Sequence, residues 1–342
     1  MFQSPMSGGT MSRPLARVLL ERYHAVDFSL LLPLLARLPL PLAYLLAAFR
    51  GWLHAKLGID WRAIAFGVDL QRLTAASFRQ MLPGRPEEEI ASLVRKRYMA
   101  QAREEFEAHL VMADRIDDLS CSFLPGADVI TRREGERGLV LLTPHFGSFF
   151  LGYAFLCRLG LRCNGMSSSV TNDPQVIPEV QRYYFRKYRA LEPKMNGGRI
   201  LDQENGLKPF YAMLQRGEVL LVLADLPASP TGAAMQVNFL GERRGLAGGA
   251  LRMAQQTGSD IGAYVCRHVG KGRYRLEFGP VSSCHDGTAL DSIYQFFSDK
   301  IMETPGCWWG ADLLQLIPSV AAASERGAEE MGVAFSADRS IA

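Results

Sequence analysis

Residues 138–150 read GLVLLTPHFGSFF, and the fold prediction starts from this stretch. Its first half is a continuous apolar run of strand length, which is typical of a strand covered on both faces. An apolar helix is predicted directly after it, over 149–159. His145 therefore stands where a buried strand ends and a helix begins, which is the edge at which open α/β sheets bind their ligands.

Strands and helices continue to alternate on both sides of this stretch. Upstream, Pro86 opens a long helix in which apolar residues recur every fourth position from Ile90 to Phe106 as one buried stripe. The later predicted segments are helices over 207–215 and 247–256 and strands over 218–224, 236–240, 261–267 and 273–278. This alternation predicts an α/β domain with a mixed, mainly parallel central sheet flanked by helices.

The N-terminal region is strongly apolar. Residues 28–49 read FSLLLPLLARLPLPLAYLLAAF, which is long enough to cross a bilayer but contains Arg37 and three prolines that break one helix into pieces. The basic and aromatic residues that follow, from Arg50 to Lys56, are of the types found at lipid headgroups. We expect an anchor or interfacial hairpin on the inner leaflet. The alternative is a hydrophobic helical cap folded onto the main domain.

Length and composition limit the remaining choices. A chain of 342 residues with 48% apolar and 21% charged residues fits one large domain and is too mixed for a polytopic membrane protein. Its net charge of +3 is too small to imply nucleic acid. The expected organisation is a disordered leader over 1–14, a hydrophobic membrane-associating helical region over 15–60, the α/β domain over 61–319 and a disordered tail over 320–342. The cysteines and the other histidines show no ligand spacing, so no metal site is expected.

The junction after the first buried strand suits acid–base chemistry. An imidazole side chain ordinarily titrates at about pH 6.5, so it can accept a proton at neutral pH, and His145 is the predicted base. A structural role is the alternative for a histidine in this place. Gly147 permits close backbone approach, and Ser148 is expected to cap the next helix, whose first N–H groups would face a developing oxyanion. The sequence has no G-x-S-x-G nucleophile elbow, which disfavours serine-hydrolase chemistry.

At this motif the chain resembles the bacterial lipid A biosynthesis acyltransferases, the late lauroyl and myristoyl transferases of the lysophospholipid acyltransferase superfamily. The resemblance covers roughly residues 28–310 as an ordered set of blocks. These blocks are LLTPHFGSFFLG (141–152), ENGLKPFYAMLQRGEVLLVLAD (204–225), NFLGERRGLAGGALRMAQQTGSDIGAYVCR (238–267) and GRYRLEF (272–278).

The resemblance implies an O-acyltransferase that needs no cofactor. It implies that a fatty acyl group moves from a thioester of acyl carrier protein or coenzyme A to a hydroxyl of a membrane lipid or lipid-linked glycan, with His145 as general base. It further implies work at the cytoplasmic face of the inner membrane, in lipopolysaccharide or surface glycan biosynthesis. Phe146, Gly147 and Ser148 belong to the motif and are expected beside the substrate.

Two departures from the family pattern matter. The family has histidine, four residues, then an acid, and here Phe150 holds the acidic position. Asp225 matches an aspartate at the end of the family's next catalytic-face strand and is the predicted replacement, with a loop-fixing hydrogen bond as its alternative role. The segment 305–310 resembles the family's proline and aromatic segment but lacks its following His-Arg-Arg. That loss argues against an acceptor as heavily phosphorylated as lipid A.

Four further polar residues are predicted to bind substrate. Asn205 and Lys208 fall on family positions with Asn and Arg and are expected to order the acceptor or donor; an exposed helix face is the alternative. Arg243 and Arg244 are expected to hold a phosphopantetheine or headgroup phosphate as paired cations, against plain surface charge. Three function classes stay open: an acyltransferase, a weak or inactive lipid-binding scaffold of the same fold, and an acyl thioesterase.

Overall fold

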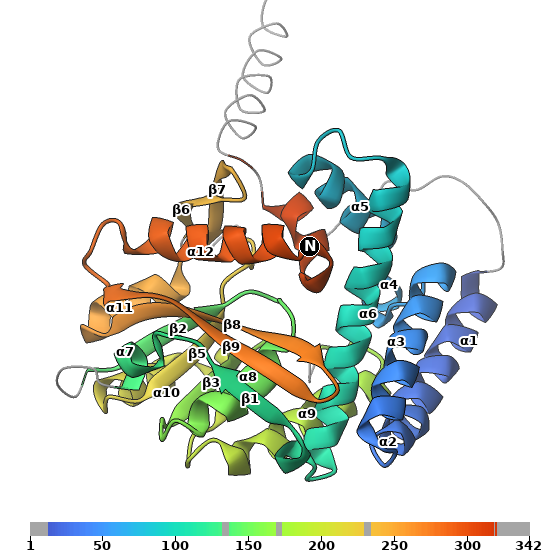
Figure 1. The fold of residues 1–342 in the computed structure, drawn as a ribbon, viewed down its shortest axis with the longest axis horizontal. Helices are drawn as coiled ribbons and strands as arrows, with labels where there is room; N and C mark the ends of the chain where they lie inside the picture. Colours follow the sequence, from blue (N-terminus) through green and yellow to red (C-terminus); the bar gives the residue numbers. More distant parts are fainter. Residues whose placement is uncertain (1–12, 132–136, 169–172, 229–233, 318, 320–342) are drawn as a thin grey trace, which may run out of the picture.

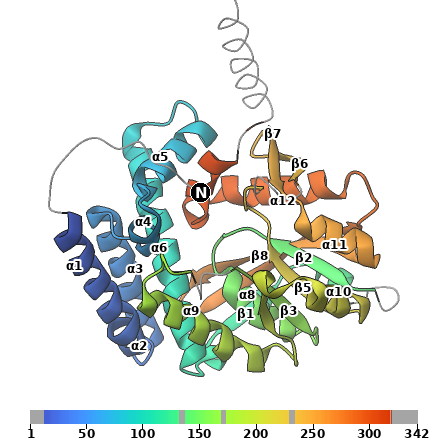
Figure 2. The same ribbon diagram turned by 180° about the vertical axis from the view of Figure 1, so that it is seen from behind.

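The computed structural model describes residues 13–131, 137–168, 173–228, 234–317 and 319 (Figure 1). A central sheet has helices on both faces, and the N-terminal helices are stacked beside it (Figures 1 and 2). The last two residues of the predicted leader, 13 and 14, begin helix α1 (Arg13–Val26), and the rest of the leader lies outside the described residues. The predicted tail over 320–342 also lies outside them.

The central sheet is mixed and mainly parallel, as predicted. Its seven strands, in spatial order, are β1 (Ser120–Phe123), β9 (Arg273–Ser283), β8 (Asp260–Gly270), β2 (Leu139–Thr143), β5 (Val219–Leu223), β3 (Cys163–Ser167) and β4 (Ile200–Asp202). Every neighbouring pair is parallel except β8 and β9, which are joined by a tight turn and run antiparallel. A separate antiparallel hairpin is formed by β6 (Ala234–Phe239) and β7 (Glu242–Ala247).

The two central strands are buried on both faces. Along β2, Leu139 and Leu141 belong to one hydrophobic core, and Val140 and Leu142 belong to the other. Side chains of a strand point alternately to its two faces, so the continuous apolar run of this segment fills both layers of the domain. This position, with one layer of helices on each face, places the ends of β2 and β5 in the middle of the molecule.

The helices predicted from sequence are present, with ends shifted by a few residues. The helices of the domain are α4 (Trp61–Phe66), α5 (Leu70–Met81), α6 (Glu87–Met112), α7 (Ala127–Thr131), α8 (Phe149–Cys157), α9 (Pro178–Leu191), α10 (Lys208–Gln215), α11 (Gly249–Thr257) and α12 (Ala289–Glu303). Short 3-10 segments are η2 (Ile116–Asp118), η4 (Glu192–Lys194), η5 (Gln203–Asn205), η6 (Pro305–Cys307) and η7 (Ala311–Leu316).

The N-terminal helices pack onto α6. After α1 come the π-helical η1 (Asp27–Leu31), α2 (Leu32–Leu35) and, beyond a break at the predicted prolines, α3 (Leu40–Leu57). The α3–α6 contact is close at Gly51, where an added Cβ would lie 2.6 Å from the Met99 Cα. The buried Arg50 guanidinium pairs with Asp27 and with Glu105 of α6. Among the described residues, no helix is both long and apolar enough to cross a membrane.

Candidate active site

The pairing of β2 with β5 brings His145 and Asp225 together. The two strands are parallel, and Thr143 pairs with Leu223 at their carboxyl ends. His145 and Asp225 each lie two residues beyond this pair. Because adjacent parallel strands run side by side in register, equal offsets beyond them reach the same point at the edge of the sheet. The backbone N–H of Ala224 donates to the Thr143 carbonyl and extends the pairing into both loops.

The Asp225 carboxylate makes three hydrogen bonds. Its Oδ1 lies 2.8 Å from Nδ1 of His145, and its Oδ2 accepts from the His145 backbone N–H at 2.9 Å and from the Trp308 indole N–H at 2.7 Å. The Asp225 side chain is 1% exposed and the His145 side chain 13%. Burial raises the pKa of the Asp225 carboxyl, but the His145 charge and the hydrogen bonds from His145 and Trp308 outweigh burial and hold it below its usual range.

This geometry selects one tautomer of the imidazole. An ionised carboxylate only accepts hydrogen bonds, so the neutral His145 ring carries its proton on Nδ1. The other nitrogen, Nε2, then keeps a lone pair that is free to accept a proton. The ring is held further by edge contacts with Phe149 and Trp309, whose ring centroids lie 5.6 and 4.6 Å from its own. The pair therefore has the arrangement of a general base with an orienting acid.

Two adjacent tryptophans fasten the histidine loop from the C-terminal side. Trp308 holds the carboxylate, and the Trp309 backbone N–H donates to the His145 carbonyl at 3.0 Å. The Trp309 carbonyl in turn accepts from the buried Arg97 side chain of α6 at 2.9 Å. The base is thus fixed by the sheet on one side and by α6, through Trp309, on the other.

Glycines make these close approaches sterically possible. Gly147 has a φ of +59°, and an added Cβ would lie 2.3 Å from the Cys266 carbonyl oxygen. An added Cβ at Gly310 would lie 2.8 Å from Oδ2 of Asp225 and 2.9 Å from the His145 Cβ. Since real Cβ contacts are never this short, any larger residue at either position would displace the histidine loop or its carboxylate.

A largely apolar cavity of about 380 Å³ opens beside the imidazole. His145 forms part of its wall, and aromatic side chains from α4, α8, α9 and the tryptophan segment form most of the rest. Those aromatic residues are Trp61, Phe66, Phe149, Phe150, Tyr153, Tyr184, Tyr188 and Trp309. Polar side chains, including Ser167, Asp173 and Gln203, also line it. The cavity therefore combines an aromatic wall suited to a long apolar group with a base in its wall.

Comparison with protein families shows which family the chain belongs to. The family model described as bacterial lipid A biosynthesis acyltransferase matches residues 28–309. The chain belongs to this acyltransferase family. The chain is therefore an acyltransferase of lipid biosynthesis, and its mixed, mainly parallel sheet is the fold expected from the resemblance.

A solved structure is among those that are similar to the chain. It is the crystal structure of the 1-acyl-sn-glycerophosphate acyltransferase PlsC from Thermotoga maritima, with 11% sequence identity and a TM-score of 0.32. The match covers 77% of this chain and 96% of that one. No curated protein sequence matches the chain significantly.

Phe150, at the acidic position of the acyltransferase family pattern, is buried in the cavity wall. Nζ of Lys187 lies over the Phe150 ring, 4.3 Å from its centroid, and also pairs with Glu104. The ring thus takes part in a cation–π contact instead of the carboxylate–imidazole contact of the family pattern. Asp225, from the neighbouring strand, lies in hydrogen-bond contact with His145 instead.

The predicted motif residues next to His145 have different surroundings. Phe146 is fully buried in the core that also contains Trp308, away from the cavity wall. Ser148 occupies the N-cap position of α8, but its side chain makes no cap hydrogen bond, so that expectation is wrong. Its backbone N–H donates to the Cys266 carbonyl at 2.8 Å and ties the start of α8 to β8.

The polar residues predicted to bind substrate do not line this cavity. Asn205 and Lys208 are exposed on η5 and at the start of α10. The Arg244 side chain is 2% exposed and donates to the Ile317 carbonyl and to Glu242, so it braces the β6–β7 hairpin and is not plain surface charge. Arg243 is exposed and pairs with Asp291 of α12 at 3.1 Å. A role of these residues in binding substrate stays a prediction.

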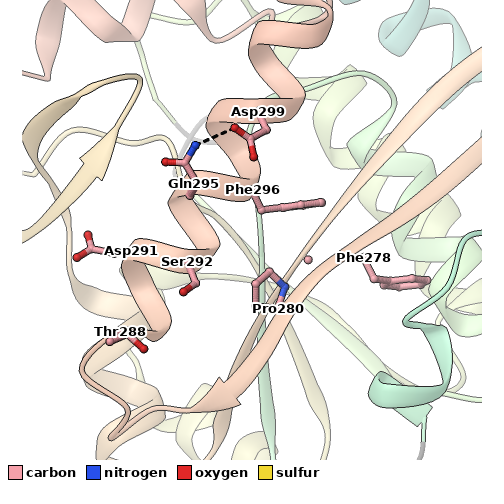
Figure 3. Close-up of a pocket in the computed structure, with 9 residues that line it drawn as sticks. Phe278, Pro280, Thr288, Asp291, Ser292, Gln295, Phe296 and Asp299 are labelled. Atoms are coloured by element: carbon pink, nitrogen blue, oxygen red, sulfur yellow. Dashed lines mark hydrogen bonds between the residues drawn. The ribbon is translucent and has the colours of Figure 1, made fainter.

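A second hollow, of about 610 Å³, lies between β9 and α12 (Figure 3). Phe278 and Pro280 contribute from the strand, and Asp291, Phe296 and Asp299 from the helix. It shares no lining residue with the cavity at His145, and no histidine lines it. Arg243 pairs with Asp291 of this hollow and is not among the residues that line the cavity at His145.

Some residues of the site were not identified from sequence. Trp308, Trp309 and Gly310 fasten the base, and the α9 residues Tyr184 and Lys187 contribute to the cavity wall. The tandem tryptophans directly before Gly310 were a usable signal, because large aromatic residues beside small ones often mark close packing. The YYFRKY run of α9 contains both the tyrosines and the lysine of the wall.

Proposed function

We propose that this acyltransferase moves a fatty acyl group from a thioester of acyl carrier protein or coenzyme A to a hydroxyl of a lipid or lipid-linked glycan. His145 is the general base in this proposal. The observation that carries it is the 2.8 Å contact between His145 and Asp225 in the wall of an apolar cavity. A base with an orienting acid and a slot for an apolar chain are the parts that such a transfer requires.

The reaction proceeds by direct attack in this proposal. Nε2 of His145 takes the proton of the acceptor hydroxyl while the hydroxyl oxygen bonds to the thioester carbonyl carbon. The carbonyl oxygen becomes an oxyanion in the tetrahedral intermediate. When the carbonyl re-forms, the C–S bond breaks, and the imidazolium returns its proton to the departing thiolate.

Asp225 acts as a positioning residue. Its carboxylate keeps the Nδ1 proton in place, so that Nε2 stays the basic nitrogen, and it stabilises the imidazolium that forms during attack. The two other donors to this carboxylate support a low pKa, so Asp225 stays ionised throughout the physiological pH range.

The size and lining of the cavity suit the acyl chain. Its volume of about 380 Å³ falls within the usual range of ligand pockets, about 300–1,000 Å³. Its lining includes Phe149, Phe150 and Tyr153 of α8 and Tyr184 and Tyr188 of α9. Aromatic walls of this kind bind a fatty chain by excluding water from it.

The N-terminal helices are the proposed membrane-contacting surface at the cytoplasmic face of the inner membrane. Most of the exposed large hydrophobic side chains among the described residues lie between positions 18 and 66. They include Leu30, Leu34, Leu45, Phe49 and Trp52. Exposed apolar groups in such a concentration, with Trp52 stacked under Lys56, suit the interface of a lipid bilayer. This surface would bring the cavity close to lipid acceptors.

The test uses purified protein, extracted membrane lipids and an acyl donor. The donor is acyl carrier protein or coenzyme A that carries a radiolabelled acyl group. We expect label to move to a lipid or glycan fraction, and His145→Ala to abolish this transfer. His285→Ala, which changes an exposed histidine outside the cavity, is the matched control and should leave transfer intact. Acyl release without acceptor would identify a thioesterase instead. Full cellular function of His145→Ala would identify a scaffold.

A further inference from the structure

The cavity at His145 offers no free positive charge among the residues that the structure describes. Besides His145, its charged lining residues are Arg62, Asp173 and Lys187. Each cation is already paired with at least one carboxylate, whereas Asp173 forms no ion pair with any residue that the structure describes. The charge of an acceptor that fits this cavity can therefore be inferred.

The Arg62 guanidinium pairs with two carboxylates. Its Nη2 lies 3.2 Å from Oδ2 of Asp60, and its Nη1 lies 3.2 Å from Oδ2 of Asp312. The same two carboxylates also pair with the fully buried Arg97, at 3.4 and 3.0 Å. Two arginines and two aspartates thus form a closed network with no net charge, and the Arg62 nitrogens are engaged within it.

The Lys187 ammonium pairs with one carboxylate and lies among aromatic rings. Its ammonium pairs with Glu104 of α6, and both side chains are 3% exposed. It also lies over the rings of Phe150 and Tyr184, 4.3 and 5.3 Å from their centroids. Apart from Glu104, the ammonium contacts aromatic rings, so it is not available to bind a phosphate.

The polar lining residues favour uncharged hydroxyl groups. Ser167 and Gln203 line the cavity with side chains that both donate and accept hydrogen bonds, and Asp173 adds a carboxylate. The sequence stretches 169–172 and 229–233, which follow Ser168 and Ala228, contain neither lysine nor arginine. A phosphate in this cavity would lose water without gaining a cation, and it would meet the negative charge of Asp173.

We propose that the part of the acceptor that carries the attacked hydroxyl, and that meets the acyl chain at the His145 end of this cavity, is uncharged. This inference rests on the proposed function and specifies its acceptor class. The acceptor presents this hydroxyl on a neutral lipid or sugar unit, and a phosphate monoester beside the hydroxyl is excluded. Any phosphate of donor or acceptor stays outside the cavity.

The test compares binding of two matched amphiphiles to the full chain: 1-dodecanoylglycerol and 1-dodecanoylglycerol 3-phosphate, each titrated calorimetrically below its micellar concentration. We expect the neutral compound to bind at least about tenfold more tightly, which corresponds to ~1.4 kcal/mol. Equal or tighter binding of the phosphate would overturn the proposal. Leu223→Trp fills the cavity. Any binding that this variant keeps therefore occurs elsewhere on the surface, and it is subtracted from the binding of the wild type.

Two charge variants sharpen the result. Asp173→Lys places a cation in the cavity and should narrow the preference for the neutral compound or reverse it. Asp117→Lys makes the same change at an exposed carboxylate outside the cavity and should leave the preference unchanged. An equal response of both variants would mean that the preference arises from overall charge, which also overturns the proposal. Binding needs no turnover, so failure of the proposed transfer reaction would appear separately, as unchanged activity in His145→Ala.

Discussion

Oδ1 of Asp225 lies 2.8 Å from Nδ1 of His145, although 80 positions separate the two residues in the chain. The contact joins the loops that follow two adjacent parallel strands. It supplies a carboxylate to a histidine whose own motif carries Phe150 at the acidic position. The following expectations test how this substitution works.

Asp225→Asn should lower kcat by about 10²- to 10⁴-fold with little change in KM. The amide keeps the shape of the side chain, but it removes the charge that stabilises the imidazolium and no longer fixes the tautomer. Steady-state transfer assays measure the effect, and circular dichroism checks that the variant is folded. A variant that keeps wild-type kcat would show that Asp225 only fixes the loop.

Phe150→Leu should keep kcat within a few fold of the wild type. Asp225, and not residue 150, contacts the base, so the change removes only ring packing and the contact with Lys187. We expect a loss of about 1–2 kcal/mol in the free energy of unfolding. Urea denaturation measures that loss, and a collapse of kcat in a folded variant would contradict this account.

Trp308→Phe should lower stability at neutral pH by about 1–3 kcal/mol, because the Asp225 carboxylate loses one donor while it stays ionised. A carboxyl with a lowered pKa contributes stability above its unfolded pKa, and this contribution is lost as the pH falls through its folded value. The difference between variant and wild type should therefore shrink in acid. Denaturation followed by circular dichroism at pH 7 and at a series of pH values below about 3.9, the usual pKa of an aspartate, measures it. A difference independent of pH would point to packing alone.

Glu107 should make the protein less stable as the pH rises. Burial raises the pKa of this α6 carboxyl to about 7, against the lowering effects of Arg103 and of the hydrogen bond from Tyr274. Between the unfolded and folded pKa values the folded state holds the extra proton, so stability falls by up to ~1.4 kcal/mol for each pH unit. Glu107→Gln should flatten this slope between pH 5 and pH 7. An unchanged slope in denaturation experiments would assign it to other groups.

The architecture was predictable from sequence because its central strands are buried on both faces. Their uninterrupted apolar runs, and the four-residue repeat of α6, are signals that no other structure explains as well. The strands β1, β3 and β4 were not predicted, since they are short and only partly buried and their sequences contain Ser, Gly, Asn and Asp. Short strands of this kind form because a neighbour pairs with them, and that information lies elsewhere in the chain.

The site was predictable in its chemistry but less so in its surroundings. His145 and Asp225 follow recognisable buried strands, and equal offsets beyond two neighbouring parallel strands bring them together. The cavity wall comes from α4, α8, α9 and the tryptophan segment, which are distant in sequence. The opposite roles of Arg243 and Arg244, one paired at the surface and one buried, depend on which face of a two-stranded hairpin each residue occupies.

The carboxylate that orients the base belongs to a sheet loop, whereas the wall beside the base is a helix. In a motif with both groups on one stretch, a reshaped helix would also disturb the imidazole. Here the α8 side chains Phe150 and Tyr153 can be exchanged while the β2–β5 pairing still holds the proton-accepting nitrogen in place. Engineering the chain preference of this enzyme should therefore start with α8, since pocket shape and reactivity reside on separate parts of the scaffold.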